Sequence, residues 1–103
     1  MGGGSSKVVE EWHKGTEWYR VWSSGLIEQG GYNPEGAREE RTITFHKEFT
    51  QTPYLSISRS LVNDATYGAM SGWCPKRVTP TGFTFMSLQS GVTYGTFWYA
   101  IGY

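Results

Sequence analysis

Apolar and polar residues alternate along several short segments of the chain. The alternation is clearest at 42–46 and 54–59; in the first of these, Ile43 and Phe45 are separated by a single threonine. A period of two is typical of a strand with one buried face and one solvated face. Both segments are therefore predicted to be strands.

A hairpin is predicted near the start of the chain. The segments 18–22 and 26–29 are separated only by Ser23, Ser24 and Gly25, a length that suits a tight turn in which Gly25 adopts a positive φ. Further strands are predicted at 8–12, 83–86 and 96–101.

Three segments are predicted to lie outside the strands. Residues 30–40 are rich in glycine and charge, which predicts a long exposed loop, and 61–72 loses the alternation, which predicts at least one more. Residues 1–6 are rich in glycine and serine and are interpreted as a flexible linker or a remnant of cloning. The folded domain is expected to span 7–103.

The last predicted strand is apolar on both sides. Phe97, Tyr99 and Ile101 fall on one face, and Trp98 and Ala100 on the other. A strand of this kind lies in the centre of a sheet or against a second chain.

Composition agrees with an all-β domain. The chain has 103 residues, enough for one domain, with 5 Trp, 7 Tyr, 5 Phe and 14 Gly. Aromatic residues favour strands and glycines favour turns. We expect a small antiparallel β-sandwich of about six to eight strands, and a chain with so much ring surface is expected to form oligomers.

Charge and hydropathy exclude several classes of protein. Nine Lys and Arg balance nine Asp and Glu, so the chain lacks the basic surface that nucleic-acid binding requires. No apolar run reaches the roughly 18 residues that a membrane-spanning helix needs, so no membrane insertion is expected. Cys74 is the single cysteine, which leaves no partner for an intrachain disulfide.

Three blocks of sequence, in order, carry a family resemblance. They are an aromatic strand that returns as Ile-x-Gln-x-Gly, a Phe-x3-Phe-x3-Pro crossover and a Trp-x-Ala-x-Gly-Tyr chain end, at 18–31, 45–53 and 98–103. Together they resemble the C-terminal domain of bacteriophage tail-fibre proteins, and the last two are also similar to H-type lectins.

The resemblance implies a lectin-like homotrimer at the distal tip of a tail fibre in the virion, where the fibre touches the bacterial surface. In H-type lectins an acidic loop residue, a basic side chain and an aromatic pair hold the sugar near subunit borders. Asp64 and Tyr67 would supply the acid and a ring, and Arg59 is the nearest candidate for the base.

Carbohydrate sites combine rings that stack on the sugar with polar groups that bind its hydroxyls. Such residues occur here where the strand pattern breaks, in predicted loops that suit a binding role. The candidate ligand-binding residues are Asn63, Asp64, Tyr67, Trp73, Gln89 and Tyr94. For Trp73 a place in the core is equally favoured. Alternation favours the core for Trp18, Trp22, Phe45, Phe83, Phe85 and Trp98.

No catalytic or metal site is predicted. His13 and His46 are far apart in the sequence and lack the spacing of metal ligands. Glutamates such as Glu39 and Glu40 lie beside arginines, where solvated ion pairs are the ordinary arrangement. No cofactor is implied.

The sequence thus favours a receptor-binding tip that is not an enzyme and that recognises a bacterial surface glycan, such as lipopolysaccharide or capsule, or an outer-membrane protein. The alternative is a structural trimerisation cap without a binding site of its own. A depolymerase is disfavoured by the short chain and the missing carboxylate pair.

Overall fold

The computed structural model describes residues 6–33, 40–61, 75–86, 88–89 and 92–103. These residues form nine strands. The strands are β1 (Val8–Lys14), β2 (Glu17–Trp22), β3 (Ile27–Asn33), β4 (Glu40–Thr44), β5 (Tyr54–Leu61), β6 (Lys76–Thr79), β7 (Gly82–Met86), β8 (Leu88–Gln89) and β9 (Val92–Gly102). In the described part of the chain, no helix has the length and apolar character needed to cross a bilayer.

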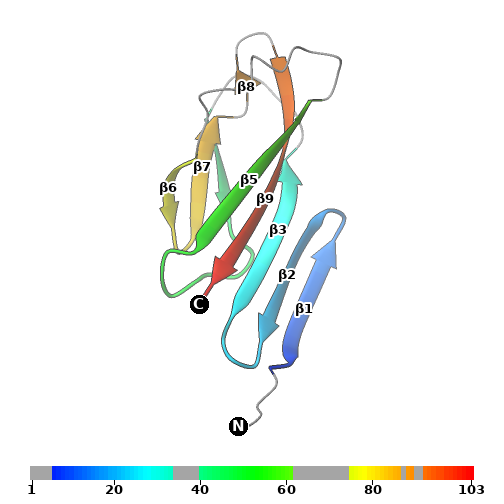
Figure 1. Ribbon diagram of the computed structural model, residues 1–103, viewed down its shortest axis with the longest axis vertical. Coiled ribbons are helices and arrows are strands. Elements are labelled where there is room, and N and C mark those ends of the chain that lie inside the picture. Colours follow the sequence, from blue (N-terminus) through cyan, green and yellow to red (C-terminus); the bar gives the residue numbers. More distant parts are fainter. Residues whose placement is uncertain (1–5, 34–39, 62–74, 87, 90–91) are drawn as a thin grey trace.

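Two antiparallel sheets face each other. The large sheet has the order β1-β2-β3-β9-β5, with β8 paired to β9, and the small sheet has the order β4-β7-β6. β1 begins and β9 ends in the lower half of the view, and β8 lies at the upper end (Figure 1). The expected all-β antiparallel sandwich is confirmed. The central position expected for the last strand is also confirmed, because β9 pairs with both β3 and β5.

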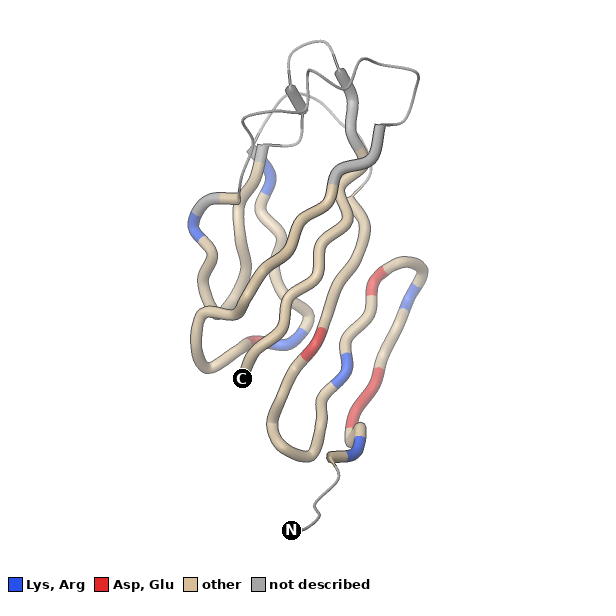
Figure 2. Tube along the Cα trace, viewed as in Figure 1, with Lys and Arg blue, Asp and Glu red and all other residues tan. Residues whose placement is uncertain are grey.

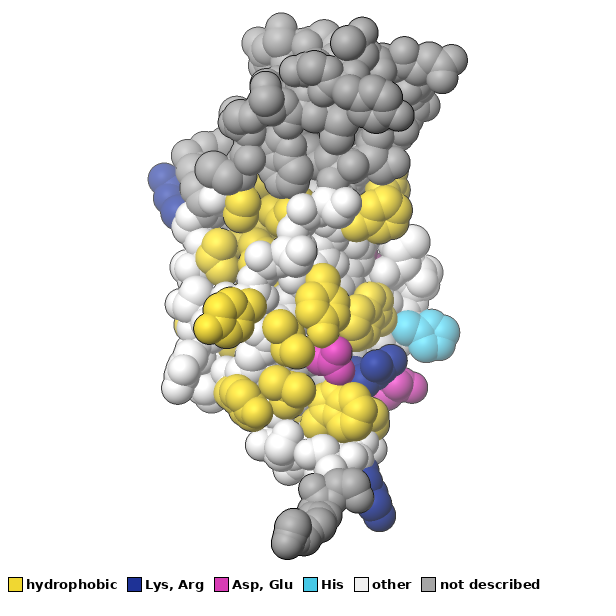
Figure 3. Space-filling view, in the orientation of Figure 1, with side chains coloured by type: hydrophobic (Ala, Val, Ile, Leu, Met, Phe, Trp, Pro, Cys, Tyr) yellow, Lys and Arg dark blue, Asp and Glu magenta, His cyan; other side chains and the backbone are white. Residues whose placement is uncertain are grey.

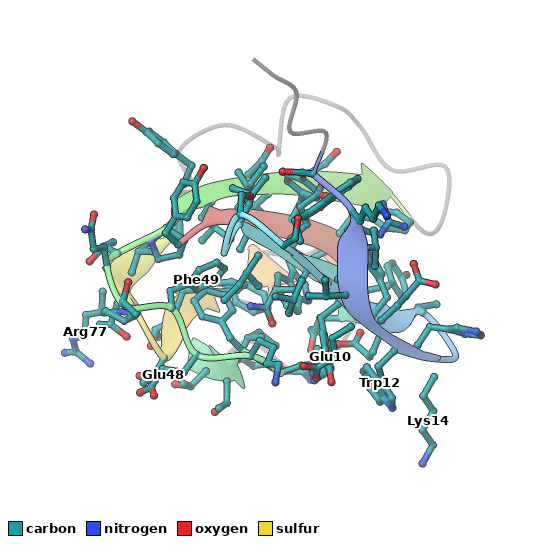
Figure 4. The ribbon with its side chains drawn as sticks, turned by 90° about the horizontal axis from the view of Figure 1, so that it is seen from below. Glu10, Trp12, Lys14, Glu48, Phe49 and Arg77 are labelled. Carbon is teal, nitrogen blue, oxygen red and sulfur yellow. The ribbon has the colours of Figure 1, made fainter. Side chains whose placement is uncertain are left out.

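The core between the sheets is built from rings. Its buried members are Phe45, Phe49, Phe83, Phe85, Trp98 and Ala100. Phe49 points between the two sheets (Figure 4) and meets Phe45 edge to face, with ring centroids 5.1 Å apart. The predicted core positions are therefore confirmed except for Trp18 and Trp22, which are only half-buried.

A buried glutamine fixes the connection between β4 and β5. The side chain of Gln29 donates to the carbonyl of Lys47 at 2.7 Å and accepts from the backbone N–H groups of His46 and Lys47 at 2.8 and 3.1 Å. A buried amide with these partners satisfied sets the position of neighbouring backbone. His46 and Lys47 are thus held beside the large sheet.

The predicted hairpin is confirmed, with Gly25 at a φ of 95°. The predicted loop at 30–40 is wrong at both ends, because β3 continues through Gly30 and Gly31 to Asn33, and β4 already begins at Glu40. The ring of Trp18 lies over Gly30, where an added Cβ would be 3.1 Å from Trp18 Nε1. The carboxylate of Glu17 covers Gly31 in the same way. Side chains of β2 therefore fill the space that the two glycines leave in β3.

Candidate functional site

The hairpin of β1 and β2 extends beyond the small sheet. All residues of β1 are exposed and all residues of β2 are half-buried. Seen from below, the small sheet lies under β5, β9 and β3, whereas Trp12 and Lys14 project from β1 on the same side, away from the small sheet (Figure 4). The inner face of the hairpin is therefore accessible.

Three rings line a hollow on this inner face. Trp12 and Tyr19 are paired across the strands and stack with centroids 5.7 Å apart and planes inclined by 23°. His46 stands against Trp12 at 4.9 Å and 51°. The hollow between the three rings has a volume of about 230 Å³. We call these rings, with Glu10, Glu17 and Lys47, the hairpin site.

Polar contacts hold the Tyr19 side of the hairpin site. The hydroxyl of Tyr19 donates to Glu10, and Lys47 Nζ lies 2.9 Å from Glu10 Oε2. The hydrogen bond from Tyr19, with that from Lys47, lowers the pKa of Glu10, and the same contacts with Glu10 raise the pKa of Tyr19 and of Lys47. The ammonium of Lys47 also lies 5.4 Å from the centre of the Tyr19 ring.

Glu17 fixes the opposite side. Its Oε1 accepts from His46 Nε2 at 2.9 Å, and its Oε2 accepts from the backbone N–H of Tyr32 at 3.0 Å. Every ring of the hairpin site is therefore held either by a hydrogen bond or by stacking. This arrangement is prepared before a ligand arrives, which lowers the entropic cost of binding.

The outer face of the large sheet is a second candidate surface. Hydrophobic side chains gather along it (Figure 3). Tyr54 is 85% exposed and Phe97 is 51% exposed. An apolar surface of this kind is typical of a contact with another molecule.

One carboxylate organises the polar part of the outer face. Glu28 accepts from Trp22 Nε1 and from the hydroxyl of Tyr99, both at 2.6 Å. The hydrogen bond from Tyr99 lowers the pKa of Glu28, whereas burial, followed by the bond to Glu28, raises the pKa of Tyr99 to about 12. Close by, Arg20 Nε lies 3.3 Å from Glu11 Oε2. Charged residues recur along the hairpin of β1 and β2, whereas strand β9 contains no charged residue (Figure 2).

The structure places only some of the predicted ligand-binding residues. Asn63, Asp64, Tyr67 and Trp73 lie outside the described residues. Gln89 belongs to β8, and Tyr94 belongs to β9, where it is paired with Leu61. The expectation that these two residues lie in loops is therefore wrong, because the strand pattern continues to this end of the large sheet. Their role in binding stays a prediction.

Arg59 lies on β5 opposite Thr96. Among the residues that the structure describes, no group of three His, Cys, Asp or Glu side chains could hold a metal ion. The hairpin site was not predicted. Its pattern is nevertheless present in the sequence, because the 8–12 and 18–22 strands, once paired, place Trp12 opposite Tyr19.

Comparison with solved structures identifies the fold. The N-truncated R2-type pyocin tail fibre superposes on 99% of this chain with a TM-score of 0.65 and 17% identity. The chain shares its fold with pyocin tail fibres. The N-truncated R1-type pyocin tail fibre matches 98% of the chain, with a TM-score of 0.62 and 22% identity. A C-terminal fragment of the P. aeruginosa R1 pyocin fibre matches 98%, with a TM-score of 0.62 and 21% identity.

The shares of the pyocin fibres that are covered differ. This chain spans 39% of the R2-type chain, 29% of the R1 C-terminal fragment and 88% of the N-truncated R1-type chain. No family profile matches the sequence. No curated protein matches it either. The expected likeness to H-type lectins stays a prediction.

Proposed function

We propose that this chain is a receptor-binding domain of a tail fibre, carried by a phage or a phage-like particle, and that it binds a glycan or an outer-membrane protein on the bacterial surface. The observation that carries the proposal is the fold shared with pyocin tail fibres over nearly the whole chain. The domain would act on the outside of the host, as the distal part of a fibre. It would bind without catalysing a reaction.

The outer face supports assembly into a homotrimer. A broad, partly apolar surface on the large sheet is formed by Trp22, Tyr54, Phe97 and Tyr99. Stable protein contacts bury about 800 Å² on each partner and are rich in aromatic residues. Light scattering should therefore report three times the 11.6 kDa mass of one chain. A monomer at micromolar concentration would contradict the trimer.

The end of the sandwich that bears β8 is the proposed receptor end. It lies opposite the start of β1 (Figure 1), so a fibre that joined the domain before β1 would leave it free. Gln89 and Tyr94 lie on strands at this end, and Leu61, the partner of Tyr94, is followed in sequence by Asn63 and Asp64. Tyr67 and Trp73 complete the proposed set. Three copies in a trimer would multiply a weak affinity by about 10²–10⁴.

The outer face also favours a second candidate function, a trimerisation cap. A cap would use its exposed rings for assembly and would carry no receptor site. Binding of the isolated domain to host cells and to an array of surface glycans separates the two functions. A receptor-binding domain retains cells or glycans, whereas a cap forms trimers and retains neither. Release of new reducing ends from capsule or lipopolysaccharide would instead reveal a depolymerase.

A further inference from the structure

We propose that the hairpin site binds a single neutral pyranose ring of a surface glycan. This inference rests on the proposed function, and it adds a second contact with the glycan. The hairpin site is built from β1, β2 and the connection after β4, and it uses none of the candidate residues at the β8 end of the sandwich.

Ring geometry gives the first argument. Trp12 is 36% exposed and lines the hollow, so its ring is the platform of the site, with Tyr19 stacked on it and His46 standing beside it. The C–H face of a pyranose packs on such rings. The hollow of about 230 Å³ is smaller than the roughly 300–1,000 Å³ of sites that enclose drug-sized ligands. It accommodates one sugar ring.

The polar groups at the rim give the second argument. A carboxylate offers about four acceptor positions. Glu10 receives hydrogen bonds from Tyr19 and Lys47, which leaves acceptor positions for sugar hydroxyls. These groups lie beside the platform, where the equatorial hydroxyls of a stacked ring would point. Ring and carboxylate together are the combination that sugar recognition needs.

Charge selects a neutral sugar. Glu10 is paired with Lys47, and Glu17 is hydrogen-bonded by His46 and lies opposite Lys14 across the strands. The carboxylate of a uronic acid would meet Glu10 and Glu17, and Lys47 is already paired with Glu10. Like charges at such short range repel each other. A neutral hexose avoids this cost and still satisfies the acceptors.

The test uses nuclear magnetic resonance of the indole N–H groups in the full chain. The Trp12 resonance is assigned from its loss in Trp12→Phe. The probes are the methyl glycosides of glucose, galactose and mannose, with glucuronate as the anionic comparison. We expect at least one neutral glycoside to shift the Trp12 resonance with a dissociation constant of about 1 mM, as the size of the ligand implies. Glucuronate should bind more weakly.

Two variants separate the hairpin site from the rest of the sheet. Because the Trp12 variants lack the reporting indole, their affinity is measured from the resonances of the glycoside itself, as is that of the wild type. Trp12→Ala should weaken glycoside binding about tenfold, the loss expected for a stacked ring. Trp12→Phe, which keeps a ring, should bind with intermediate affinity. The control is Val9→Ala, which shortens an exposed side chain of the same hairpin outside the hairpin site and should leave binding unchanged. Circular dichroism and light scattering on each variant report folding and assembly.

Each remaining outcome overturns a defined claim. If the wild type binds host cells but no neutral glycoside shifts the Trp12 resonance, the hairpin site is refuted and the proposed function stands. If Trp12→Ala binds glycosides as tightly as the wild type, the platform is refuted in the same way. If Trp12→Ala lowers the mass of the assembly, the hollow is a contact between copies of the chain. If the wild type binds neither cells nor glycosides, both proposals fail.

Discussion

The large sheet contains tryptophans in two different environments. Trp98 lies where the small sheet covers the large sheet, and Trp12 lies in the hairpin, which the small sheet does not cover. Trp98 is 4% exposed and packs against Phe45 and Phe83, with centroids 5.7 Å from each. Trp12 is 36% exposed and borders an open hollow together with Tyr19 and His46. The core is therefore complete without the hairpin, and the rings of the hairpin are available for contacts with other molecules.

Deleting whole strands gives the largest expected effect. Removal of residues 97–103 eliminates most of β9, the strand that joins β3 to β5. We expect this chain to be unfolded or insoluble. Removal of residues 1–14 deletes the exposed strand β1 and should leave a folded protein. Circular dichroism and thermal melting distinguish the two, and equal melting temperatures for both deletions would break the comparison.

Single ring deletions should reproduce the contrast on a smaller scale. Phe83 is 1% exposed in the core, so Phe83→Ala should lower the free energy of unfolding by about 3–5 kcal/mol. Trp12→Ala removes an exposed ring and should lower it by about 0.5 kcal/mol. Urea unfolding measures both values. A larger loss for Trp12→Ala than for Phe83→Ala would show that the hairpin belongs to the core.

Glycine substitution tests the packing of β2 on β3. A Cβ at Gly30 would lie 2.6 Å from the carbonyl oxygen of Trp98, so Gly30→Ala forces the strands apart and should cost about 1–3 kcal/mol. The control is Gly15→Asn in the turn of the hairpin. Gly15 has a φ of 62° and no neighbour within 4 Å, and asparagine tolerates this conformation. Similar losses in the two variants would contradict the proposed crowding at Gly30.

At neutral pH the smallest expected effect is that of Tyr99, whose contribution changes with pH only in the alkaline range. The pKa of Tyr99 in the folded protein is raised from 10.0 to about 12, so the folded state holds this proton more tightly than the unfolded state. The resulting stabilisation is complete below pH 10 and is lost as the pH rises to about 12. In Tyr99→Phe, thermal melting followed over this range should show a shallower decline than in the wild type. Identical slopes would exclude the contribution of Tyr99.

Strands with a clean alternation could be predicted from the sequence, and strands with glycine at their centre could not. Ile43 and Phe45 repeat at a period of two and predict a strand at 42–46; the strand is present as β4 at Glu40–Thr44, two residues earlier, and Phe45 follows it. Gly30 and Gly31 indicate a break, yet they continue β3 because Trp18 and Glu17 cover them from the neighbouring strand. That cover is a tertiary contact, and local propensity carries no trace of it.

The candidate site shows the same limit. Gln89 and Tyr94 were selected because the alternation is lost around them, and loss of alternation predicts loops. Both residues instead belong to strands. The hairpin site depends instead on register and on a distant segment. Trp12 meets Tyr19 through strand pairing, and His46 joins them because Gln29 holds its backbone. A residue 34 positions after Trp12 becomes its neighbour only in the folded chain.

Strand β1 is an edge strand of the large sheet, and this position has a consequence for solubility. An edge strand presents unpaired backbone N–H and C=O groups, with which a strand of another molecule can pair, and repeated pairing of this kind builds fibrils. β1 opposes such growth with Glu10, Glu11, His13 and Lys14, and with an irregular register between Val8 and Glu10. The polar character of this strand thus acts against fibrillar aggregation, quite apart from any ligand that the hairpin binds.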